Sequence, residues 1–308
     1  MPISDSIDKR ERFSKESSTS LEKAVKAVQG ALYSLVVEKI LNSLETDGDG
    51  IIKFTVSNAR TAARFKQVWA THQRQSGKLT QWIVKQLVKL FDLNTAYMRE
   101  VTNVTDSLEA RARKRLLLNL GYDLDAKKIL PDSWLDNLAA QSDVKQRVVN
   151  KLNTAIQSKM PLKQFRKEFR DDFLGAKGQG WVERYFNARS QDLFSQFDRS
   201  TQAVYRDELK LNYAIYSGTI KQPSPKSSGT RDFCWRRVNN LYDLETIEKW
   251  NSLDWNGKIE GSDVKLTCGG YGCRHHLSWV SEEMAATLQK RGRELNKLNP
   301  PKPVTKQK

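Results

Sequence analysis

The chain has 308 residues, a formal net charge of +16, 38% hydrophobic residues and 29% charged residues. No apolar run approaches the roughly 20 residues needed to cross a bilayer, and the polar N-terminal segment lacks the apolar core of a secretory signal. Three cysteines do not form the even set of a secreted disulfide framework. With a mean hydropathy of −0.65, we expect a soluble, helix-rich protein used in a cytosol-like compartment.

The positive charge predicts an anionic partner, because uncompensated charge of this size attracts polyanions over a long range. The sequence pI is about 9.7, and nucleic acid, expected as double-stranded DNA, is the leading candidate. The alternative is a basic surface that serves solubility alone, since the charge is spread along the chain. We expect no membrane partner and no small-molecule substrate.

The N-terminal part predicts a polar arm followed by a helical domain. Residues 1–20 are rich in Ser, Lys and Glu, which favours a mobile arm. Residues 21–130 are expected to form the N-terminal domain, in which apolar positions recur at helical spacing. The elements expected within it are a helix over 21–44, a turn at 47–50, a short strand over 51–56, and helices over 57–76 and 79–101.

A basic helix completes this domain. A capping box from Asp106 to Glu109 predicts its start and Gly121 its end. Its cationic residues could lie against phosphates or form a solvated face, and they are Arg111, Arg113, Lys114 and Arg115. Charge density assigns further phosphate contacts to Lys290, Arg291 and Arg293 near the C-terminus.

Residues 131–212 predict a helical middle region. Phe165, Phe169 and Phe173 recur every four residues, which is typical of a core-packing stripe. Residues 175–180 are expected to form a flexible joint. One long helix over 181–211 follows, with a near-heptad pattern typical of a helix packed along another helix or of an oligomer seam.

The sequence changes character at Tyr213. The alternation in YAIYSGTI predicts a strand, and the next stretch, QPSPKSSG, predicts a loop. A short helix over 244–250 and a hairpin through WNGKIEG are expected next. Residues 213–283 are thus expected to form a small α+β module, and 284–308 a helix and a basic disordered tail. The predicted fold class is mainly α: long-helix N-terminal and middle regions with a small α+β C-terminal module.

Cysteine and histidine gather in this module. Cys234, Cys268, Cys273 and His275 make a Cys3His set, which zinc accepts in a closed tetrahedral site. In an extended segment, Cys273 and His275 point to the same face. The alternative is that the cysteines are small apolar core residues able to oxidise to a disulfide, since the spacing is not that of a zinc ribbon. The expected cofactor is none, or one structural zinc ion.

No catalytic residue is expected. Cys273 beside His275 has the residue types of a thiol enzyme, but adjacency in sequence is not triad geometry. The main enzymatic alternative is a metal-dependent nuclease, because His275 and His276 with a metal could activate water. A nearby acid such as Asp263 is a possible partner for this pair, but nothing in the sequence supports a role for it.

Two short motifs mark the module. The first is Thr230-Arg231-Asp232-Phe233-Cys234, and the second is Gly269-Gly270-Tyr271-Gly272-Cys273-Arg274-His275. With the long helix and strand before them and the helix ending at Trp250 between them, this order resembles the C-terminal region of phage minor head proteins of the Mu F-like head-morphogenesis family. The resemblance covers about residues 150 to 283. The motif residues that carry it are Thr230, Arg231, Cys234, Gly270, Tyr271, Cys273, Arg274 and His275.

The resemblance implies a structural role in a tailed phage. A protein of this family is present in a few copies per capsid, with the portal protein and capsid proteins as partners. It would be located in the virion, in the capsid interior or at the portal vertex, and in the host cytoplasm during assembly. Contact with packaged DNA would suit the positive charge. The alternative is a free DNA-binding protein with a structural zinc module.

Overall fold

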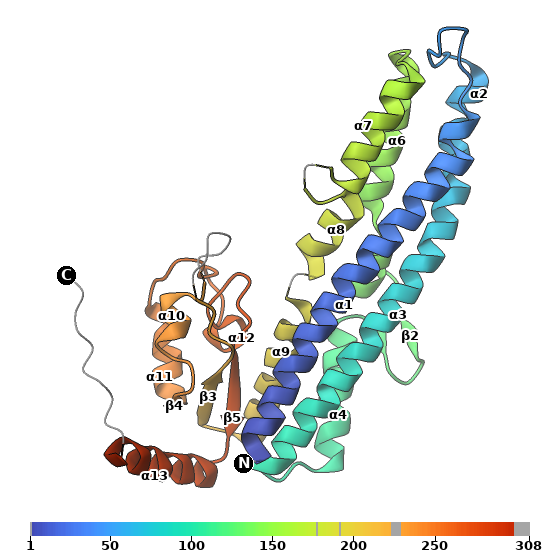
Figure 1. The fold of residues 1–308 in the computed structure, drawn as a ribbon. Helices are drawn as coiled ribbons and strands as arrows, with labels where there is room; N and C mark the ends of the chain where they lie inside the picture. Colours follow the sequence, from blue (N-terminus) through green and yellow to red (C-terminus); the bar gives the residue numbers. More distant parts are fainter. Residues whose placement is uncertain (1, 177, 191, 223–228, 299–308) are drawn as a thin grey trace, which may run out of the picture. The chain divides into compact units, whose positions relative to one another are not determined.

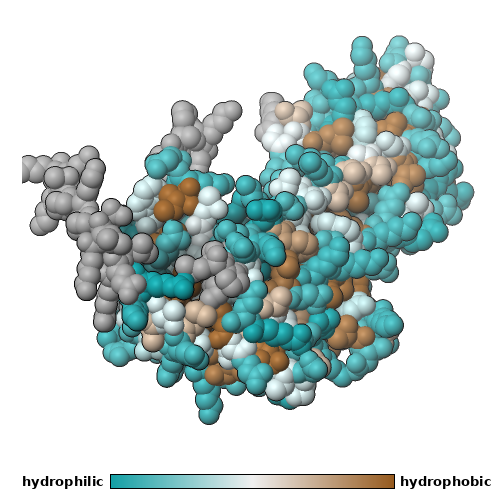
Figure 2. Space-filling view, turned by 60° about the horizontal axis from the view of Figure 1, so that its bottom comes forward, coloured by the Kyte–Doolittle hydropathy of each residue, from teal (hydrophilic) through white to brown (hydrophobic). Residues whose placement is uncertain are grey.

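The computed structural model describes residues 2–176, 178–190, 192–222 and 229–298. Within these residues the fold is mainly α, with a small α+β module near the C-terminus, which confirms the predicted fold class (Figure 1). No helix in the described part of the chain is both long and apolar enough to cross a membrane. Hydrophilic residues cover most of the face in Figure 2, where hydrophobic residues form small separate groups.

The chain divides into two compact units, and neither is continuous in sequence. Unit 1 contains residues 1–15, 88–116 and 192–308, and unit 2 contains residues 16–87 and 117–191. This differs from the expected sequential domains 21–130, 131–212 and 213–283. The reason is that two helices, α1 (Pro2–Lys39) and α3 (Thr61–Val101), are each long enough to contribute residues to both units.

Unit 2 is a helical bundle with one two-residue antiparallel ribbon, β1 paired with β2. Besides its parts of α1 and α3, its elements are η1 (Leu41–Ser43), α2 (Val56–Ala59), β1 (Tyr122–Asp123), β2 (Lys128–Ile129), α5 (Trp134–Ala140), α6 (Ser142–Gln157), α7 (Leu162–Leu174) and α8 (Trp181–Ser190). The strand expected over 51–56 is replaced by isolated bridges, in which Ile52 pairs with Thr46 and Ile51 with Pro161.

Three phenylalanines of α7 lie at the centre of the unit 2 core. Phe165, Phe169 and Phe173 are fully buried, which confirms the predicted core stripe. The ring centroid of Phe169 lies 5.3 Å from that of Phe173 and 5.8 Å from that of Trp181 in α8. Tyr33 of α1 contacts Phe173 at 6.1 Å. Burial of one such side chain contributes about 1.5–3 kcal/mol, so the stripe holds α1, α7 and α8 together.

A side chain of α1 caps the start of α8. Gln29 is buried, and its Oε1 accepts hydrogen bonds from the backbone N–H groups of Val182 and Glu183, at 3.0 and 3.1 Å. The first N–H groups of a helix have no partner within it, so this side chain satisfies two of them. Gly180 allows the approach, because a Cβ at this position would overlap the Gln29 amide. The cap fixes the position of α8 in unit 2.

Unit 1 combines helices with a three-stranded antiparallel sheet of order β4-β3-β5. Besides its parts of α1 and α3, its elements are α4 (Asp106–Asn119, of which 106–116 belong to this unit), α9 (Leu193–Leu209), β3 (Tyr213–Ser217), α10 (Asp232–Trp235), β4 (Leu241–Asp243), α11 (Leu244–Lys249), η2 (Trp250–Ser252), α12 (Val264–Thr267), β5 (His276–Val280) and α13 (Glu282–Leu298). The predicted strand at Tyr213 is therefore confirmed as the central strand.

Strand β5 is the most enclosed strand of the sheet. It pairs with β3 along its whole length, from His276 opposite Ser217 to Val280 opposite Tyr213. All five of its residues are buried, because α9 packs against it within unit 1. The residues that immediately precede β5 are the second motif, so the strand fixes one end of the candidate site.

The structure corrects the expected mobile arm over 1–20. From Pro2 onward these residues form the first turns of α1. Ile7, Arg10, Ser14 and Ser17 are buried at spacings of three and four residues, which is one face of a helix. The polar composition predicted a mobile arm because most of the side chains that are buried on that helix face are themselves polar.

Three further local expectations were wrong. The helices expected over 57–76 and 79–101 are largely one helix, α3, because Gly77 is accommodated within it at a cost of about 1 kcal/mol relative to alanine. The single helix over 181–211 is two helices, with Asp192 in a left-handed conformation at the start of α9. The described residues 255–261 form turns and no strand, so WNGKIEG is not a hairpin.

Candidate functional site

The two sequence motifs meet in one buried group. Cys234 lies on α10, and Cys273 and His275 lie in the segment that leads into β5; all three are buried. The Cys234 and Cys273 Sγ atoms are 3.8 Å apart, and Cys273 Sγ lies 3.5 Å from His275 Nδ1. The three ligand atoms all lie within 4.8 Å of one another and could hold a metal ion.

Glycines allow the second motif to pass close to the sulfur atoms. A Cβ on Gly269 would overlap Cys234 Sγ, and the Gly269 N–H donates a hydrogen bond to Cys273 Sγ at 3.2 Å. Gly270 has φ +89°, and a Cβ there would overlap the carbonyl of Gly257. The glycines are therefore explained by close packing around the cysteines and by a left-handed turn.

Hydrogen bonding sets the protonation of the two close thiols. The pKa of Cys273 is well below that of an ordinary thiol, because its sulfur accepts a hydrogen bond from Cys234 and lies beside His275 and Arg199. The pKa of Cys234 is raised in turn, since its proton is the one shared with Cys273 and the site is buried. The O–H of Tyr216 also donates to Cys234 Sγ, at 3.2 Å. The arrangement favours one thiolate at Cys273.

The structure brings together three of the four predicted metal ligands. Cys268 is fully buried but is not a member of the group formed by the other three. Burial raises the pKa of Cys268 to about 12. Its backbone φ is +49°, and it lies directly after α12.

The remaining motif residues hold the segments around the cysteines. The Arg231 guanidinium donates to the backbone carbonyl of Tyr271, which ties the first motif to the second. Thr230 Oγ1 accepts a hydrogen bond from the Lys221 N–H at 2.7 Å. The Tyr271 side chain is 67% exposed and Arg274 is exposed, so neither contributes to the buried group.

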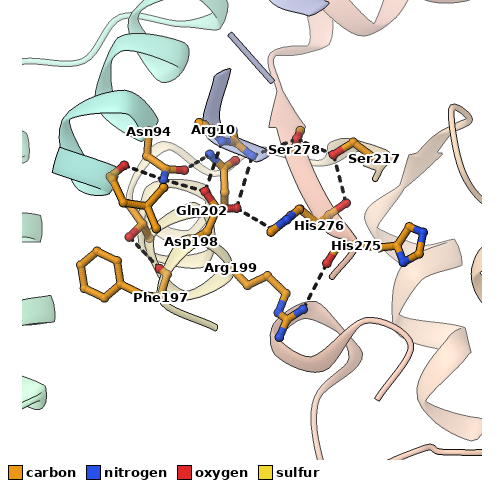
Figure 3. Close-up of polar contacts among 12 residues, drawn as sticks. Arg10, Asn94, Phe197, Asp198, Arg199, Gln202, Ser217, His275, His276 and Ser278 are labelled. Atoms are coloured by element: carbon orange, nitrogen blue, oxygen red, sulfur yellow. Dashed lines mark hydrogen bonds and ion pairs between the residues drawn. The ribbon is translucent and has the colours of Figure 1, made fainter. Parts of the chain in front are cut away.

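A second buried polar cluster, which the sequence analysis missed, lies on the other side of β5 (Figure 3). Asp198 of α9 is its centre: Asp198 Oδ2 lies 2.7 Å from His276 Nδ1, and Oδ1 lies 3.2 Å from Arg10 Nε. The Asn94 amide donates to Asp198 Oδ1 at 2.8 Å, and Arg10 Nη2 donates to Ser278 Oγ at 3.2 Å. Arg10, Asp198 and His276 are each at most 2% exposed.

Further hydrogen bonds extend this cluster to the backbone of β5. The Gln202 amide donates to Asn94 Oδ1 at 2.6 Å and accepts from the Trp279 N–H at 3.2 Å. The Tyr97 hydroxyl donates to the Trp279 carbonyl at 2.9 Å. Four elements, α1, α3, α9 and β5, are thus joined within unit 1. The sequence did contain an indication that Asp198 is buried, because it lies on the same helix face as the apolar residues Phe194 and Phe197.

Arg199 connects α9 to the group formed by Cys234, Cys273 and His275. It is buried, and its Nη1 donates to the carbonyls of Cys273 and His275, at 2.9 and 3.1 Å. These two bonds fix the backbone between Cys273 and His275. Sequence reasoning missed this residue as well, because a single arginine in a helix gives no signal of burial.

The predicted phosphate contacts on α4 are partly neutralised. Arg113 lies 2.6 Å from both Asp92 and Glu109, and Arg111 lies 3.7 Å from Glu208. Lys114 and Arg115 are exposed, as are Lys290 and Arg291 on α13. The side chain of Arg293 and the tail from residue 299 onward lie outside the described residues.

Comparisons of the chain with models of protein families, with curated proteins and with solved structures found no match.

Proposed function

We propose that the chain is a minor structural protein of a tailed-phage head, and that its C-terminal module is stabilised by a structural zinc ion. The observation that carries the proposal is that the two motifs resembling those of the Mu F-like family converge on one buried group, Cys234, Cys273 and His275. The positive charge fits a protein that lies beside packaged DNA, with the portal and capsid proteins as partners.

The ligand spacing supports zinc. Zinc bonds of about 2.3 Å to sulfur and about 2.0 Å to nitrogen place two sulfurs about 3.8 Å apart in a tetrahedron, and a sulfur and a nitrogen about 3.5 Å apart. The Cys234–Cys273 and Cys273–His275 ligand atoms are separated by 3.8 and 3.5 Å. Hydrogen bonds from Gly269 and Tyr216 to the two sulfurs are the kind that support thiolate ligands.

A structural role also fits the setting of the group better than catalysis. A nuclease needs a metal whose open position can be reached by water and a phosphodiester. Three protein ligands leave the fourth position of a tetrahedral zinc to another ligand, so access to the group decides between the two roles. All three ligands here are buried, and the neighbouring His276 is in contact with Asp198 within the second polar cluster. Neither histidine is exposed where a substrate could reach it.

Metal content tests the zinc assignment. We expect about one zinc per chain, by inductively coupled plasma mass spectrometry, in protein purified without added metal. Cys273→Ala should lose the zinc, and Cys268→Ala, which removes an equally buried thiol outside the group, should keep it. Absence of zinc in the wild-type protein would contradict the assignment. Loss of two free thiols under oxidising conditions would instead indicate a Cys234–Cys273 disulfide.

Particle composition tests the head role. Quantitative mass spectrometry of purified particles, from the phage or induced prophage that encodes the chain, should recover it at a low copy number relative to the main coat protein. Recovery from infected cells but not from particles would reject the head role. It would favour the second candidate, a free DNA-binding protein, for which the observation is the net charge of +16.

A further inference from the structure

Unit 2 contains a pocket between α6 and α8 that the sequence motifs do not touch. Its volume is about 220 Å³, and three arginines, Arg147, Arg184 and Arg189, line it together with Trp181 and Tyr185. On α8 the lining residues recur at spacings of three and four, so one face of the helix forms one wall. The first turns of α6 supply the other wall.

One of the arginines is held in place by its neighbours. The Arg189 guanidinium lies 3.9 Å from the centroid of the Tyr185 ring, and its Nη2 lies 2.9 Å from Asp143 Oδ2. The Tyr185 hydroxyl donates to the Asn137 carbonyl at 2.6 Å, which fixes the ring beneath the arginine. Arg189 therefore presents a guanidinium whose orientation is already determined before any ligand arrives.

The other two arginines keep their charge unpaired. Arg147 and Arg184 are exposed, and no carboxylate within the described residues makes an ion pair with either of them. Asp143 is the only acid that lines the described pocket, so the cations outnumber it. Like charges around one hollow repel each other, and an anion placed there would relieve the repulsion. This differs from α4, where Arg113 is paired twice.

We propose that this pocket binds a phosphate of a DNA backbone. Arginine forks match the oxygens of a phosphodiester in pairs, and the mostly buried Trp181 and Tyr185 add an apolar contact for the adjoining sugar. This inference rests on the proposed function for its ligand, since packaged DNA is the anion that the chain would meet. It assigns the contact to α6 and α8 rather than to α4.

The test compares three pairs of charge-removing substitutions in the full-length protein. Binding to a fluorescein-labelled DNA duplex is measured by anisotropy over a range of salt concentrations. R147Q with R184Q should weaken binding by about tenfold or more at low salt, and should reduce the slope of log K against log salt by about 2. Neither side chain makes an ion pair in the described structure, so thermal unfolding should be unchanged.

Two matched controls remove the same charge elsewhere. K163Q with K167Q changes two exposed residues of α7 in the same unit, and R111Q with R115Q changes the basic helix. Both should affect binding less than the pocket pair does. Equal losses of DNA affinity for the pocket pair and the α7 pair would overturn the proposed phosphate site. The proposal would also be overturned if the wild-type protein did not bind the duplex at low salt. Neither result touches the head role, which particle composition tests separately.

Discussion

Arg10 and Asp198 form a buried ion pair, and such a pair is stable only if both charges keep their partners. Burial alone would raise the pKa of Asp198, but Arg10, His276 and the hydrogen bond from Asn94 hold it well below its usual range. Arg10 also lies 4.6 Å from the centroid of the Tyr97 ring, which adds a cation–π contact. The pair joins the first turns of the chain to its last strand through Ser278.

Replacing Asp198 by asparagine should destabilise unit 1 strongly. The change keeps the shape but leaves the Arg10 charge buried without a counter-charge, a loss of about 3–5 kcal/mol. Urea unfolding measures it. The matched control is Glu245→Gln, which breaks an exposed i,i+4 pair with Lys249 and should cost at most about 0.5 kcal/mol. Equal losses in the free energy of unfolding for the two substitutions would show that the buried pair contributes no more to stability than the exposed pair.

His72 predicts a pH dependence of stability in unit 2. Burial lowers the pKa of His72, although its hydrogen bond with Gln141 opposes this. Nε2 contacts Gln141 Oε1 at 3.0 Å, while Nδ1 is buried without a hydrogen-bond partner in the described structure. A second proton would therefore place an unpaired charge in the core. The unfolded chain, with a histidine pKa of about 6.5, binds that proton more readily.

The stability of unit 2 should consequently be complete above about pH 6.5 and decline as the pH falls below it. Urea midpoints between about pH 7.5 and pH 5.5 measure this, and His72→Gln should flatten the decline. An unchanged slope in the variant would assign the pH dependence to other groups. If the variant is too unstable to study, nuclear magnetic resonance titration of the His72 ring gives the same answer, because its pKa should lie below that of a free histidine.

At the scale of the element, periodicity was a good guide wherever the buried face is apolar. The stripe of α7 and the strand at Tyr213 were predicted for this reason. Periodicity failed where the buried face is polar, as in the first turns of α1. It also gave no sign that Gly77 lies within an unbroken α3. Tertiary packing decides such cases, and a single sequence does not show what packs against it.

The aromatic stripe of α7 should dominate the stability of unit 2. Phe169→Ala removes a ring that contacts Phe165, Phe173 and Trp181, and we expect a loss of about 3–5 kcal/mol. Lys167→Ala on the exposed side of the same helix is the control and should stay within about 0.5 kcal/mol of the wild type. Unfolding by urea, followed by circular dichroism, distinguishes them. A loss below about 1 kcal/mol for Phe169→Ala would contradict this account of the core.

At the scale of the whole molecule, the candidate site was more predictable than the division into units. The residue types of the predicted Cys3His set pointed to Cys234, Cys273 and His275, and these residues do meet. The predicted set also included Cys268, which lies outside the group, because residue type does not show which way a turn directs a side chain. The units were not predictable, since each is assembled from segments far apart in the chain.

Removing the first residues of the chain should therefore destabilise the C-terminal module, residues 213–283. A protein that lacks residues 2–15 loses Ile7 and Arg10, and with them the partner of Asp198. We expect faster proteolysis within residues 213–283, read by mass spectrometry of the fragments. A shorter truncation that begins at Ser6 keeps both side chains and should resist as the full chain does. Identical cleavage of the two truncated proteins would show that the first turns are dispensable.

The division of unit 1 between both ends of the chain has a consequence for synthesis. Unit 2 is complete once residue 191 has left the ribosome, whereas unit 1 needs residues 192–308 as well. At ordinary translation rates this delay is on the order of 10 s, during which unit 2 can fold while the first helical turns still lack their partners on α9 and β5. A chain terminated at residue 191 would keep unit 2 and leave Arg10 without Asp198 and Ser278, a state that chaperones and proteases could distinguish from the finished protein.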